Sequence, residues 1–356
     1  MIDGVTTYGS EYLIEQIKHT EPVFICTIGT TETSRIEGIS GAGATPELTE
    51  YTPAADVELM VLNEVKCTGK IAQTVVGEAA APTPAVLTKA SVELAETPFV
   101  IVDAGSKIKP EIECMRLGKE YGRDIRTGKG VLNPLEIYEN AKELGFQLGT
   151  LHDCLFIGES IAAGTTTALG VLKALGYDAD GKVSGCMPTN PHELKTSVVE
   201  EGLENAGLTP GEVDAFQAIG AVGDPILPAI AGLVLASGDT PIVLCGGTQM
   251  AAVCAIIKSI KPNFEFSRVN IATTVYVAKD ETANLLNLLE QIDPEITLHV
   301  VDPKFEESID EGLKLYTEGF VKEGAGAGGA MLLALIRGAS VKSLRERIEM
   351  ECQNTL

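Results

Sequence analysis

From about residue 97 onward, short apolar runs alternate with longer amphipathic stretches. The apolar runs are rich in β-forming residues and predict strands over 98–102, 154–157, 215–219, 241–244, 271–277 and 296–301. The stretches between them predict helices over 135–144, 165–175, 191–206, 226–236, 249–260 and 284–292. Continuous apolar strands joined by crossover helices are typical of a parallel sheet covered on both faces. The pattern therefore predicts an α/β fold with a doubly wound, mostly parallel six-stranded sheet.

The two ends of the chain have a different pattern. Before residue 97 it predicts a short helix over 8–19, a β-rich run over 23–28 and two further helices over 54–62 and 84–94. The segment 62–82 between these two helices is predicted to be irregular or short-stranded. After residue 304 it predicts an acidic helix, a very apolar helix and a helix of mixed charge, over 305–320, 330–336 and 341–350. We expect residues 1–94 and 305–356 to form a smaller, mainly helical domain beside a Rossmann-like core domain of residues 95–304.

Residues 29–53 are rich in Gly, Thr, Glu and Ala and show no clear periodicity. A loop this long inside a compact protein is usually functional or mobile. The segment either covers part of a site, lies at a dimer interface or is a solvated connector, and the pattern leaves these alternatives open.

Small residues follow four of the predicted strands, in the sequences DAG, IGES, IGAVG and LCGGT. In a doubly wound sheet the carboxyl ends of the strands converge on one edge, where ligands bind. Glycine also commonly ends a strand without any such role. Four instances favour a ligand cleft at this edge.

Residues 156–170 carry the clearest candidate site. An apolar run ends at Gly158-Glu159, a loop of small residues follows, and a helix is predicted to begin at Thr165. Free N–H groups at a helix start, next to glycines, can bind an anion, and threonine hydroxyls can cap the helix or contact phosphate oxygens. An ordinary strand-to-helix turn with a threonine cap would have the same pattern.

Two glycine-containing stretches match the spacing of nucleotide-binding loops but lack the sequence context that such loops require. Residues 324–329 (GAGAGG) fit the spacing GxGxxG, but they follow a predicted helix rather than a strand. Residues 176–182 (GYDADGK) resemble a P-loop, yet Val183 stands where Ser or Thr is required. We therefore reject both as nucleotide-binding loops.

Charge and composition argue against some classes of function, such as binding to nucleic acid or membranes. The 356 residues contain 27 Lys and Arg against 50 Asp and Glu, a net charge of −23, which would repel nucleic acid and anionic lipid. No apolar stretch approaches the roughly 18 residues that a membrane span needs, and the first residues carry no basic or apolar leader. The eight cysteines form no CxxC pair and the four histidines show no ligand spacing. We expect a cytoplasmic protein with reduced cysteines, no metal site and small-molecule substrates.

Six short motifs, in order over about residues 97–336, resemble those of the nicotinate-nucleotide–dimethylbenzimidazole phosphoribosyltransferase family. Asp103-Ala104-Gly105 resembles its DAG strand end, and Gly158-Glu159 with 165–168 is similar to its GE(M)GI(G/A)NTTA loop. Ser184-Gly185 followed by Lys195 resembles its GTG…K segment. Residues 220–232, 245–252 and 322–327 resemble its GG-x-(E/D)-x-AA-x-AG, DG(F/Y)-x-x-(S/T)-x-AA and GEG(T/S)GA motifs.

The resemblance implies a homodimeric enzyme, without a cofactor, that makes the α-ribazole phosphate of the cobamide lower ligand. It implies that Glu323 is the catalytic base and that Glu159 is a second catalytic carboxylate. The residues that it implies in substrate binding are Asp103, Gly105, Gly158, Gly164, Thr165, Thr166, Thr167, Ser184, Gly185, Lys195, Gly220, Gly223, Gly246, Gly247, Thr248, Gly324 and Gly326. Among them, Lys195 and the helix start at Thr165–Thr167 would hold the substrate phosphate.

The chain also departs from the family pattern. The Asn before Thr-Thr is replaced by Thr165, or by Gly164 in another alignment, Cys245 replaces Asp, and Lys322 replaces Gly. The segment before Glu96 does not resemble the bacterial N-terminus. We therefore expect a distant, archaeal-type branch. A phosphoribosyltransferase for another base, for example adenine, and a non-catalytic nucleotide-binding protein remain the alternatives.

Overall fold

A computed structural model describes residues 2–43, 45–71 and 73–355. Ala44, in the predicted loop of residues 29–53, and Ala72, in the segment 62–82, lie outside the described residues. Within the described ranges, no helix is both long and apolar enough to cross a membrane.

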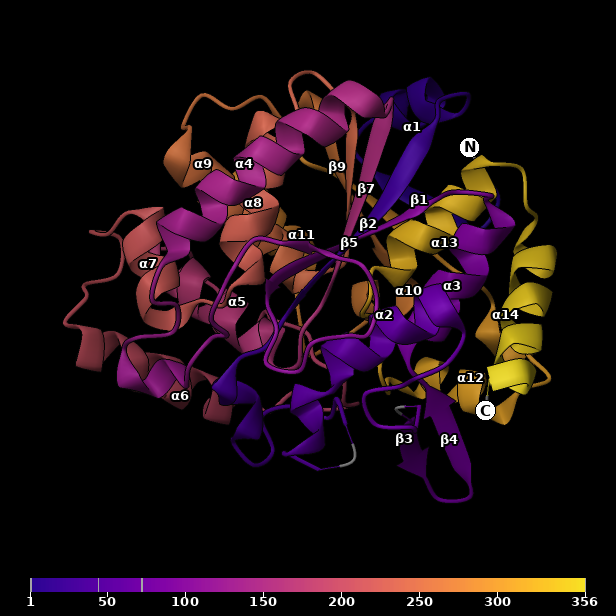
Figure 1. Cartoon of the computed structure of the whole chain (residues 1–356), viewed down its shortest axis with the longest axis horizontal. Coiled ribbons are helices and arrows are strands. Elements are labelled where there is room, and N and C mark those ends of the chain that lie inside the picture. Colours follow the sequence, from indigo (N-terminus) through magenta and orange to yellow (C-terminus); the bar gives the residue numbers. More distant parts are fainter. Residues whose placement is uncertain (1, 44, 72, 356) are drawn as a thin grey trace.

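A large sheet runs through the middle of the molecule (Figure 1). In the described residues it has eight strands, in the order β1 (Val5–Tyr8), β10 (Thr297–Val301), β9 (Val269–Thr274), β8 (Ile242–Cys245), β7 (Cys154–Ser160), β2 (Pro22–Gly29), β5 (Phe99–Gly105) and β6 (Met115–Arg116). Only β1 is antiparallel to its neighbour, and the other pairings are parallel. The predicted α/β class and mostly parallel sheet are confirmed, although the predicted number of six strands is wrong.

One predicted strand is a helix. Residues 215–219 belong to α7 (Ala215–Val222). The backbone N–H of Gln217 donates to the Asp214 carboxylate, and the Asp214 N–H donates to the Gln217 side chain, which forms a capping box. A short apolar run alone does not distinguish a buried strand from a buried helix. Here the capping box at Asp214 stabilises the helix.

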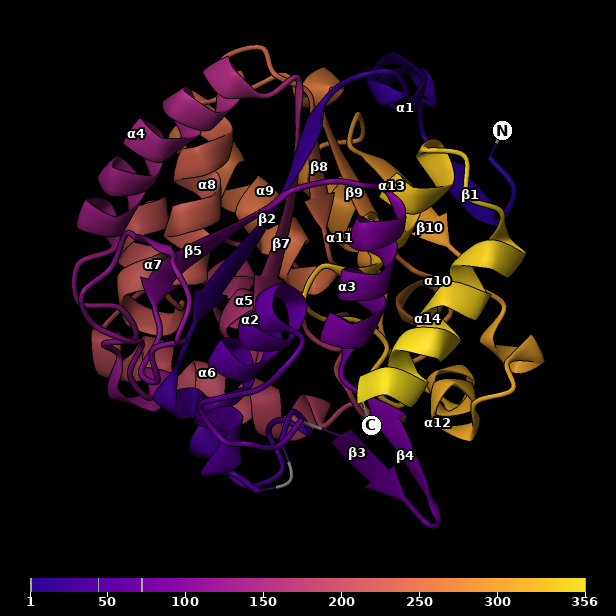
Figure 2. The same ribbon diagram turned by 45° about the vertical axis from the view of Figure 1, so that its right-hand side comes forward.

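Helices cover both faces of the sheet, as predicted (Figures 1 and 2). One layer contains α4 (Pro134–Leu151), α5 (Gly164–Ala174), α8 (Ile226–Ala236) and α9 (Thr248–Ile260), with α6 (His192–Ala206), α7 and α11 (Leu285–Ile292) packed beside them. The other layer contains α2 (Thr52–Leu62), α3 (Pro84–Leu94), α13 (Ala327–Ile336) and α14 (Val341–Thr355). All residues of α13 are buried, because this helix packs between the sheet and α3.

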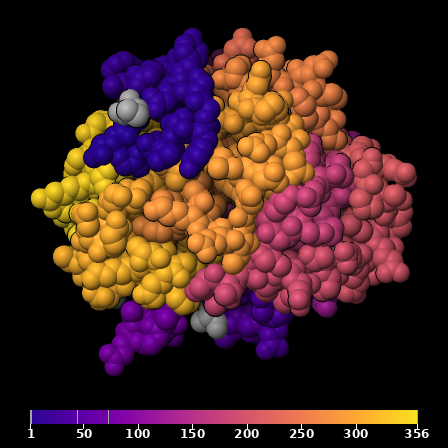
Figure 3. All heavy atoms as spheres, turned by 180° about the vertical axis from the view of Figure 1, so that it is seen from behind, coloured from indigo at the N-terminus to yellow at the C-terminus, as the bar shows by residue number. Residues whose placement is uncertain are grey.

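The second layer brings together segments from the two ends of the chain. Seen from behind, the first residues lie beside the C-terminal part of the chain on the surface (Figure 3). However, β2 from the N-terminal segment is an interior strand of the sheet, between β7 and β5. The division into domains of residues 95–304 and of 1–94 with 305–356 stays a prediction.

The predicted acidic helix over 305–320 is a series of short turns instead. It contains two 3-10 turns (Phe305–Glu307 and Leu315–Glu318) around α12 (Glu311–Lys314). The rings of Phe305 and Tyr316, both fully buried, contact each other edge to face with centroids 5.6 Å apart. Burial of both rings in one cluster folds the segment back on itself and prevents one continuous helix.

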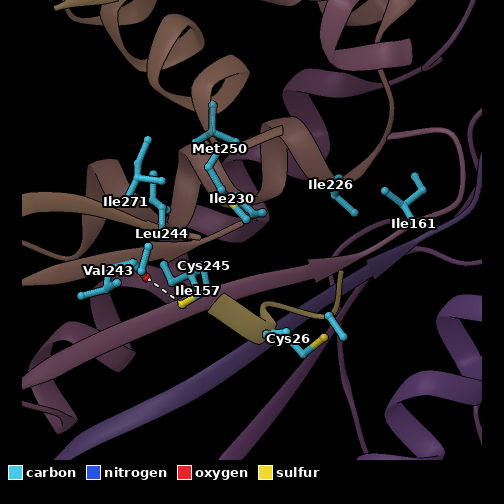
Figure 4. Packing of buried hydrophobic residues seen from close by; sticks show 14 of the residues in the cluster. Cys26, Ile157, Ile161, Ile226, Ile230, Val243, Leu244, Cys245, Met250 and Ile271 are labelled. Atoms are coloured by element: carbon cyan, nitrogen blue, oxygen red, sulfur yellow. Dashed lines mark hydrogen bonds between the residues drawn. The ribbon is translucent and has the colours of Figure 1, made fainter. Parts of the chain in front are cut away.

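The remaining elements are α1 (Tyr12–Ile17), the four-residue α10 (Val275–Ala278), four further 3-10 turns and a hairpin of β3 (Gln73–Val76) and β4 (Ala79–Pro82), which projects from the body in Figures 1 and 2. The 3-10 turns are Glu32–Arg35, Leu48–Glu50 and Ile125–Thr127, and another at Phe266–Arg268 precedes β9. Figure 4 shows the packing at the sheet centre, where Cys26 and Cys245 lie among Ile, Val and Leu side chains. Both thiols are fully buried and behave as small apolar groups.

Candidate active site

A cavity lies at the carboxyl ends of β7 and β8, as predicted for a doubly wound sheet. It encloses about 960 Å³ of space, counting the solvent at its open mouth. Residues 40–43 line part of it, so this part of the long loop of residues 29–53 reaches the site. The start of α5, the segments 184–186 and 321–325, and residues of α2, β3 and α3 complete the lining.

Nine of the nineteen predicted site residues line this cavity: Glu159, Gly164, Thr165, Ser184, Gly185, Gly247, Thr248, Glu323 and Gly324. Two of the four small-residue strand ends, IGES and LCGGT, therefore converge as expected. The segment that resembles GEG(T/S)GA also reaches this cavity, although it lies far along the chain from both.

The other predicted site residues lie behind the lining or away from it. Lys195 lies directly behind it, and Thr167 donates to the buried Asp224 at the start of α8. Gly158 and Gly326 lie against each other, since a Cβ on Gly158 would come within 2.9 Å of the Gly326 Cα. These two glycines allow the start of α13 to approach β7 closely. Thr166, fully buried in α5, and Gly246 are also absent from the lining.

The DAG and IGAVG segments do not reach the cavity. The Asp103 carboxylate accepts from Gly105 N, Ser106 N and the Lys109 ammonium at 3.0, 2.7 and 2.7 Å, which stabilises its own loop. Gly220 lies within α7, and Gly223 ends that helix. The prediction that Gly105, Gly220 and Gly223 meet at the cleft with the other strand ends is therefore wrong.

One end of the cavity has the features of an anion site. Helix α5 begins at Gly164, after Ala163 in the left-handed region (φ 64°), and no side chain caps its first N–H groups. The Lys195 ammonium, 1% exposed, donates to the Thr165 hydroxyl at 2.8 Å. Burial, with the nearby Lys322 charge, lowers the pKa of Lys195 to about 8. In the described part of the chain Lys195 forms no ion pair, so an anion would gain strongly from it.

Glu323 lies on a constrained segment between Phe320 and α13. Val321 and Lys322 have φ of 64° and 61°, a conformation that is costly for a β-branched residue. Hydrogen bonds hold this backbone in place: Val321 N donates to Cys186 O at 2.8 Å, and the Thr274 hydroxyl donates to Lys322 O at 2.6 Å. Backbone strain of this kind gathers at functional sites.

The Glu323 carboxylate accepts four hydrogen bonds. One oxygen accepts from Gly324 N and Gly328 N at 3.1 Å each, and the other from Thr274 N at 3.1 Å and the Thr273 hydroxyl at 3.2 Å. Burial nevertheless raises the pKa of Glu323 to about 7, because desolvation outweighs the four bonds. A carboxyl with this pKa can take up or release a proton near neutral pH.

Two further carboxyls at the site are buried. Glu159 is 4% exposed, and its pKa lies well above the usual range because of burial and the neighbouring Asp224 and Glu323 charges. Asp56, on α2, accepts from the Thr83 and Ser160 hydroxyls at 2.7 Å each. Burial raises the pKa of Asp56 to about 6.

Sequence reasoning missed Asp56 and the ion pair of Lys322 with Asp280. The Lys322 ammonium lies 2.6 Å from an Asp280 oxygen that also accepts from the Ser184 hydroxyl at 2.7 Å. Burial acts to raise the Asp280 pKa, but the bonds from Lys322 and its neighbours outweigh it and hold the pKa well below its usual range. The one local signal for Asp56 was an acidic residue within the apolar stretch of α2, and Glu58 in the same helix shows the same signal.

The described side chains form no group of three or more His, Cys, Asp or Glu residues suited to hold a metal ion. The groups that gather at the cavity are an anion site, three buried carboxyls and one buried ion pair. This set suits acid–base and charge-stabilising chemistry on a small anionic molecule.

No known protein-family model matches the chain. Among solved structures, CobT from Thermus thermophilus is similar with a TM-score of 0.58 and 17% identity, covering 91% of this chain and 83% of that one. A structure of the nicotinate-nucleotide-dimethylbenzimidazole phosphoribosyltransferase from the same organism gives a TM-score of 0.57 and 17% identity, covering 91% and 85% of the two chains. This chain therefore shares its fold with these structures.

Other proteins are more similar to this chain in sequence than these two structures are. The chain is 53% identical over 358 residues to a UPF0284 protein of Methanothermobacter thermautotrophicus, which covers 100% of this chain and 99% of the relative. It is 43% identical over 340 residues to a UPF0284 protein of Methanosarcina mazei and 42% identical over 343 residues to one of Methanopyrus kandleri. These alignments cover 94% and 95% of this chain, and 95% and 89% of the two relatives. With identity of this extent over nearly the whole length, the chain belongs to the UPF0284 protein family.

Proposed function

We propose that this protein is a pentosyltransferase that moves a phosphoribosyl group from nicotinate mononucleotide to a benzimidazole-type base. The product would be a nucleotide like α-ribazole phosphate, for the lower ligand of a cobamide. The observation that carries this proposal is that one cavity holds both a buried carboxyl with a pKa of about 7, Glu323, and an anion site at Thr165 and Lys195. The fold shared with CobT and the ordered motifs of residues 97–336 support it.

The anion site would hold the 5′-phosphate of the donor. Lys195 supplies the charge, and the first N–H groups of α5 supply hydrogen bonds. Binding the phosphate at this end would direct the ribose C1′ toward Glu159 and Glu323, which line the same cavity. The C1′–N bond to the pyridinium ring then breaks, and its electron pair neutralises the nicotinate ring nitrogen. The developing positive charge on the ribose is stabilised by the neighbouring carboxylates.

The acceptor base attacks C1′ through one imidazole nitrogen and loses the proton of its N–H group to Glu323. Of the four donors on this carboxylate, three are backbone N–H groups, and only the Thr273 hydroxyl can rotate away. The incoming N–H would take its place on that oxygen. The proton then lies on Glu323, and the new C1′–N bond completes the transfer.

The test is release of nicotinate from nicotinate mononucleotide, followed by chromatography, with and without 5,6-dimethylbenzimidazole. We expect base-dependent release by the wild-type protein and a reduction of about 10²- to 10⁴-fold in kcat/KM for Glu323→Gln, the usual contribution of a general base. Glu318→Gln changes an exposed glutamate five residues earlier in the chain, at the end of the turn Leu315–Glu318, and serves as the matched control. A folded wild-type protein that releases no nicotinate with any azole or purine would refute the proposal, and a non-catalytic nucleotide-binding protein would then be the better interpretation.

A further inference from the structure

A buried ion pair lies directly beside Glu323, and the transfer reaction described above does not use it. Lys322 lines the cavity, and its ammonium lies 2.6 Å from an Asp280 oxygen, with each side chain only 3% exposed. The motif that this segment resembles has glycine in place of Lys322, so the resemblance gives the lysine no role. Burying two charges is costly, and neutral side chains of similar size often stabilise a fold equally well. The pair therefore suggests a role beyond stability.

Both ends of the short helix α10 hold the backbone that presents Glu323. Before the helix, Thr274 N donates to the Glu323 carboxylate at 3.1 Å, and the Thr274 hydroxyl donates to Lys322 O at 2.6 Å. Two residues after the helix, Asp280 binds the Lys322 ammonium. Lys322 has a φ of 61°, a costly conformation that persists only where surrounding contacts hold it. The ion pair is one of these contacts.

Asp280 also connects this backbone to the anion site. The Asp280 oxygen that binds Lys322 accepts from the Ser184 hydroxyl at 2.7 Å and from the Asn190 amide at 2.9 Å. The Ser184 carbonyl oxygen lies 3.4 Å from the Lys195 ammonium. A change in the charge of the pair should therefore act on both Glu323 and Lys195.

The two charges of the pair oppose each other at these titrating groups. A lone positive charge would favour the ionised Glu323 carboxylate and disfavour the Lys195 ammonium, and a lone negative charge would do the reverse. Burial is the main cause of the low pKa of Lys195. Among the charges near Lys195, those of Cys186 and Asp280 raise this pKa and that of Lys322 lowers it. Lys322 and Asp280 together thus leave both groups close to balance.

Other ionisable groups face Glu323 and Lys195 from the elements packed around them. They are Glu159 on β7 with its neighbours Asp56 and Asp224, Cys245 on β8, Tyr316 in the turn after α12, and Cys186 beside Lys195. None of them is altered by a substitution of Lys322 or Asp280. They help to set the position of the pH profile of the wild-type protein, whereas differences between variants report on the ion pair.

We propose that Lys322 and Asp280 are positioning residues for the transfer: their ion pair holds the Glu323 carboxylate where the N–H group of the acceptor reaches it, and Asp280 balances the Lys322 charge so that Glu323 and Lys195 work in one pH range. This inference rests on the proposed function. Neither residue takes up a proton or forms a bond with the substrate during the transfer. Each acts through Glu323 and Lys195.

The test is the pH profile of kcat/KM for nicotinate release by the wild type, Lys322→Met, Asp280→Asn and the double variant. Loss of the positive charge in Lys322→Met should raise the pKa of both Glu323 and Lys195. Both limbs of the profile should then move to higher pH by about one unit, as expected for one charge roughly 10 Å away. Asp280→Asn should move both limbs to lower pH. The substrates titrate identically in all four experiments, so a difference between profiles comes from the protein.

The double variant separates charge from position. It leaves no charge of the pair unpartnered, so it should fold, and its profile should return to the pH of the wild type. The maximum of kcat/KM should fall by about ten- to a hundredfold, because the contact that holds the Glu323 backbone is lost. If one single variant does not fold in urea denaturation, the other and the double variant still make the comparison.

Lys322→Met is the cleaner of the two single variants. Four hydrogen bonds from Thr282, Ser184 and Asn190 remain on Asp280 in this variant and favour its ionised form. The matched control is Lys89→Met, which breaks an equally buried ion pair with Glu351 outside the cavity lining. This control should leave the pH profile in place.

The outcomes distinguish the inference from the proposed function. Opposite movement in the single variants, with return in the double variant, supports the inference. Profiles that stay at the wild-type pH or move in the same direction, or a double variant with full activity, overturn it and leave the transferase intact. If the wild type releases no nicotinate, the proposed function fails. An NMR titration of the Glu323 carboxyl carbon, assigned by its absence in Glu323→Gln, then decides the inference: opposite changes of its pKa in the single variants support it, and an unchanged pKa overturns it.

Discussion

Substitution of Gly328 by alanine tests the close contact between α13 and β9 that holds Glu323. A Cβ on Gly328 would lie 2.4 Å from the Thr273 carbonyl carbon and 2.7 Å from a Glu323 carboxylate oxygen. Because ordinary contacts of a Cβ begin near 3.4 Å, the helix start and the strand must separate by about 1 Å. Overpacking of this kind costs about 1–3 kcal/mol of the free energy of unfolding. The shift also moves Gly328 N, one of the four donors to Glu323.

Gly220→Ala is the matched control, because this glycine has room for a methyl group. Its Cβ would meet no atom closer than 3.6 Å, and it lies within α7. Alanine in a helix interior is favoured over glycine by up to about 1 kcal/mol, so this variant should be as stable as the wild type or more so. Urea denaturation followed by circular dichroism measures both variants, and nicotinate release measures activity. Equal stability and activity of Gly328→Ala and the wild type would refute the packing argument, and loss of activity in Gly220→Ala would show that α7 belongs to the site after all.

Two further predictions concern the charges in the cavity. The value of kcat/KM should rise as the pH passes about 7, because Glu323 then ionises and can act as a base. It should fall above about pH 8, because Lys195 then loses its proton. A profile that is flat between pH 6 and 9 would contradict both roles. Lys195→Met should raise the KM for nicotinate mononucleotide by about 10- to 100-fold, the usual contribution of a charged hydrogen bond. Lys173→Met removes a lysine in the last turn of α5 that pairs with Asp180 and Glu200, and it should leave KM unchanged. An equal effect of the two substitutions would exclude a specific phosphate contact.

The parts of the fold that the sequence predicts are those with strong local patterns. Buried parallel strands such as β7 and β8 are continuous apolar runs, and α8 begins and ends at the predicted residues. The place of β2 inside the sheet has no local signal, since its partners in β5 and β7 lie 75 and 132 residues further along the chain (Phe24 pairs with Phe99 and Phe156). Pairing between strands so distant depends on the whole fold.

Some residues of the candidate site could likewise be predicted from local patterns, and others could not. Thr165 and Lys195 lie in recognisable segments, and Glu323 stands in a short motif, so each could be named in advance. Asp56 becomes part of the site only because its carboxylate meets Ser160, 104 residues away. Lys322 meets Asp280 across 42 residues. Neither contact follows from spacing along one helix or strand, and both therefore required the structure.

The position of β1 has a consequence for the order in which the protein folds. Its partner, β10, is synthesised almost 300 residues later, so β1 remains unpaired through most of translation. At a typical rate of about 5–20 residues per second, that delay is on the order of 15–60 s. The sheet therefore cannot close at this edge before nearly all of the chain has left the ribosome. Slow refolding, limited by contacts between distant segments, is the expected kinetic signature.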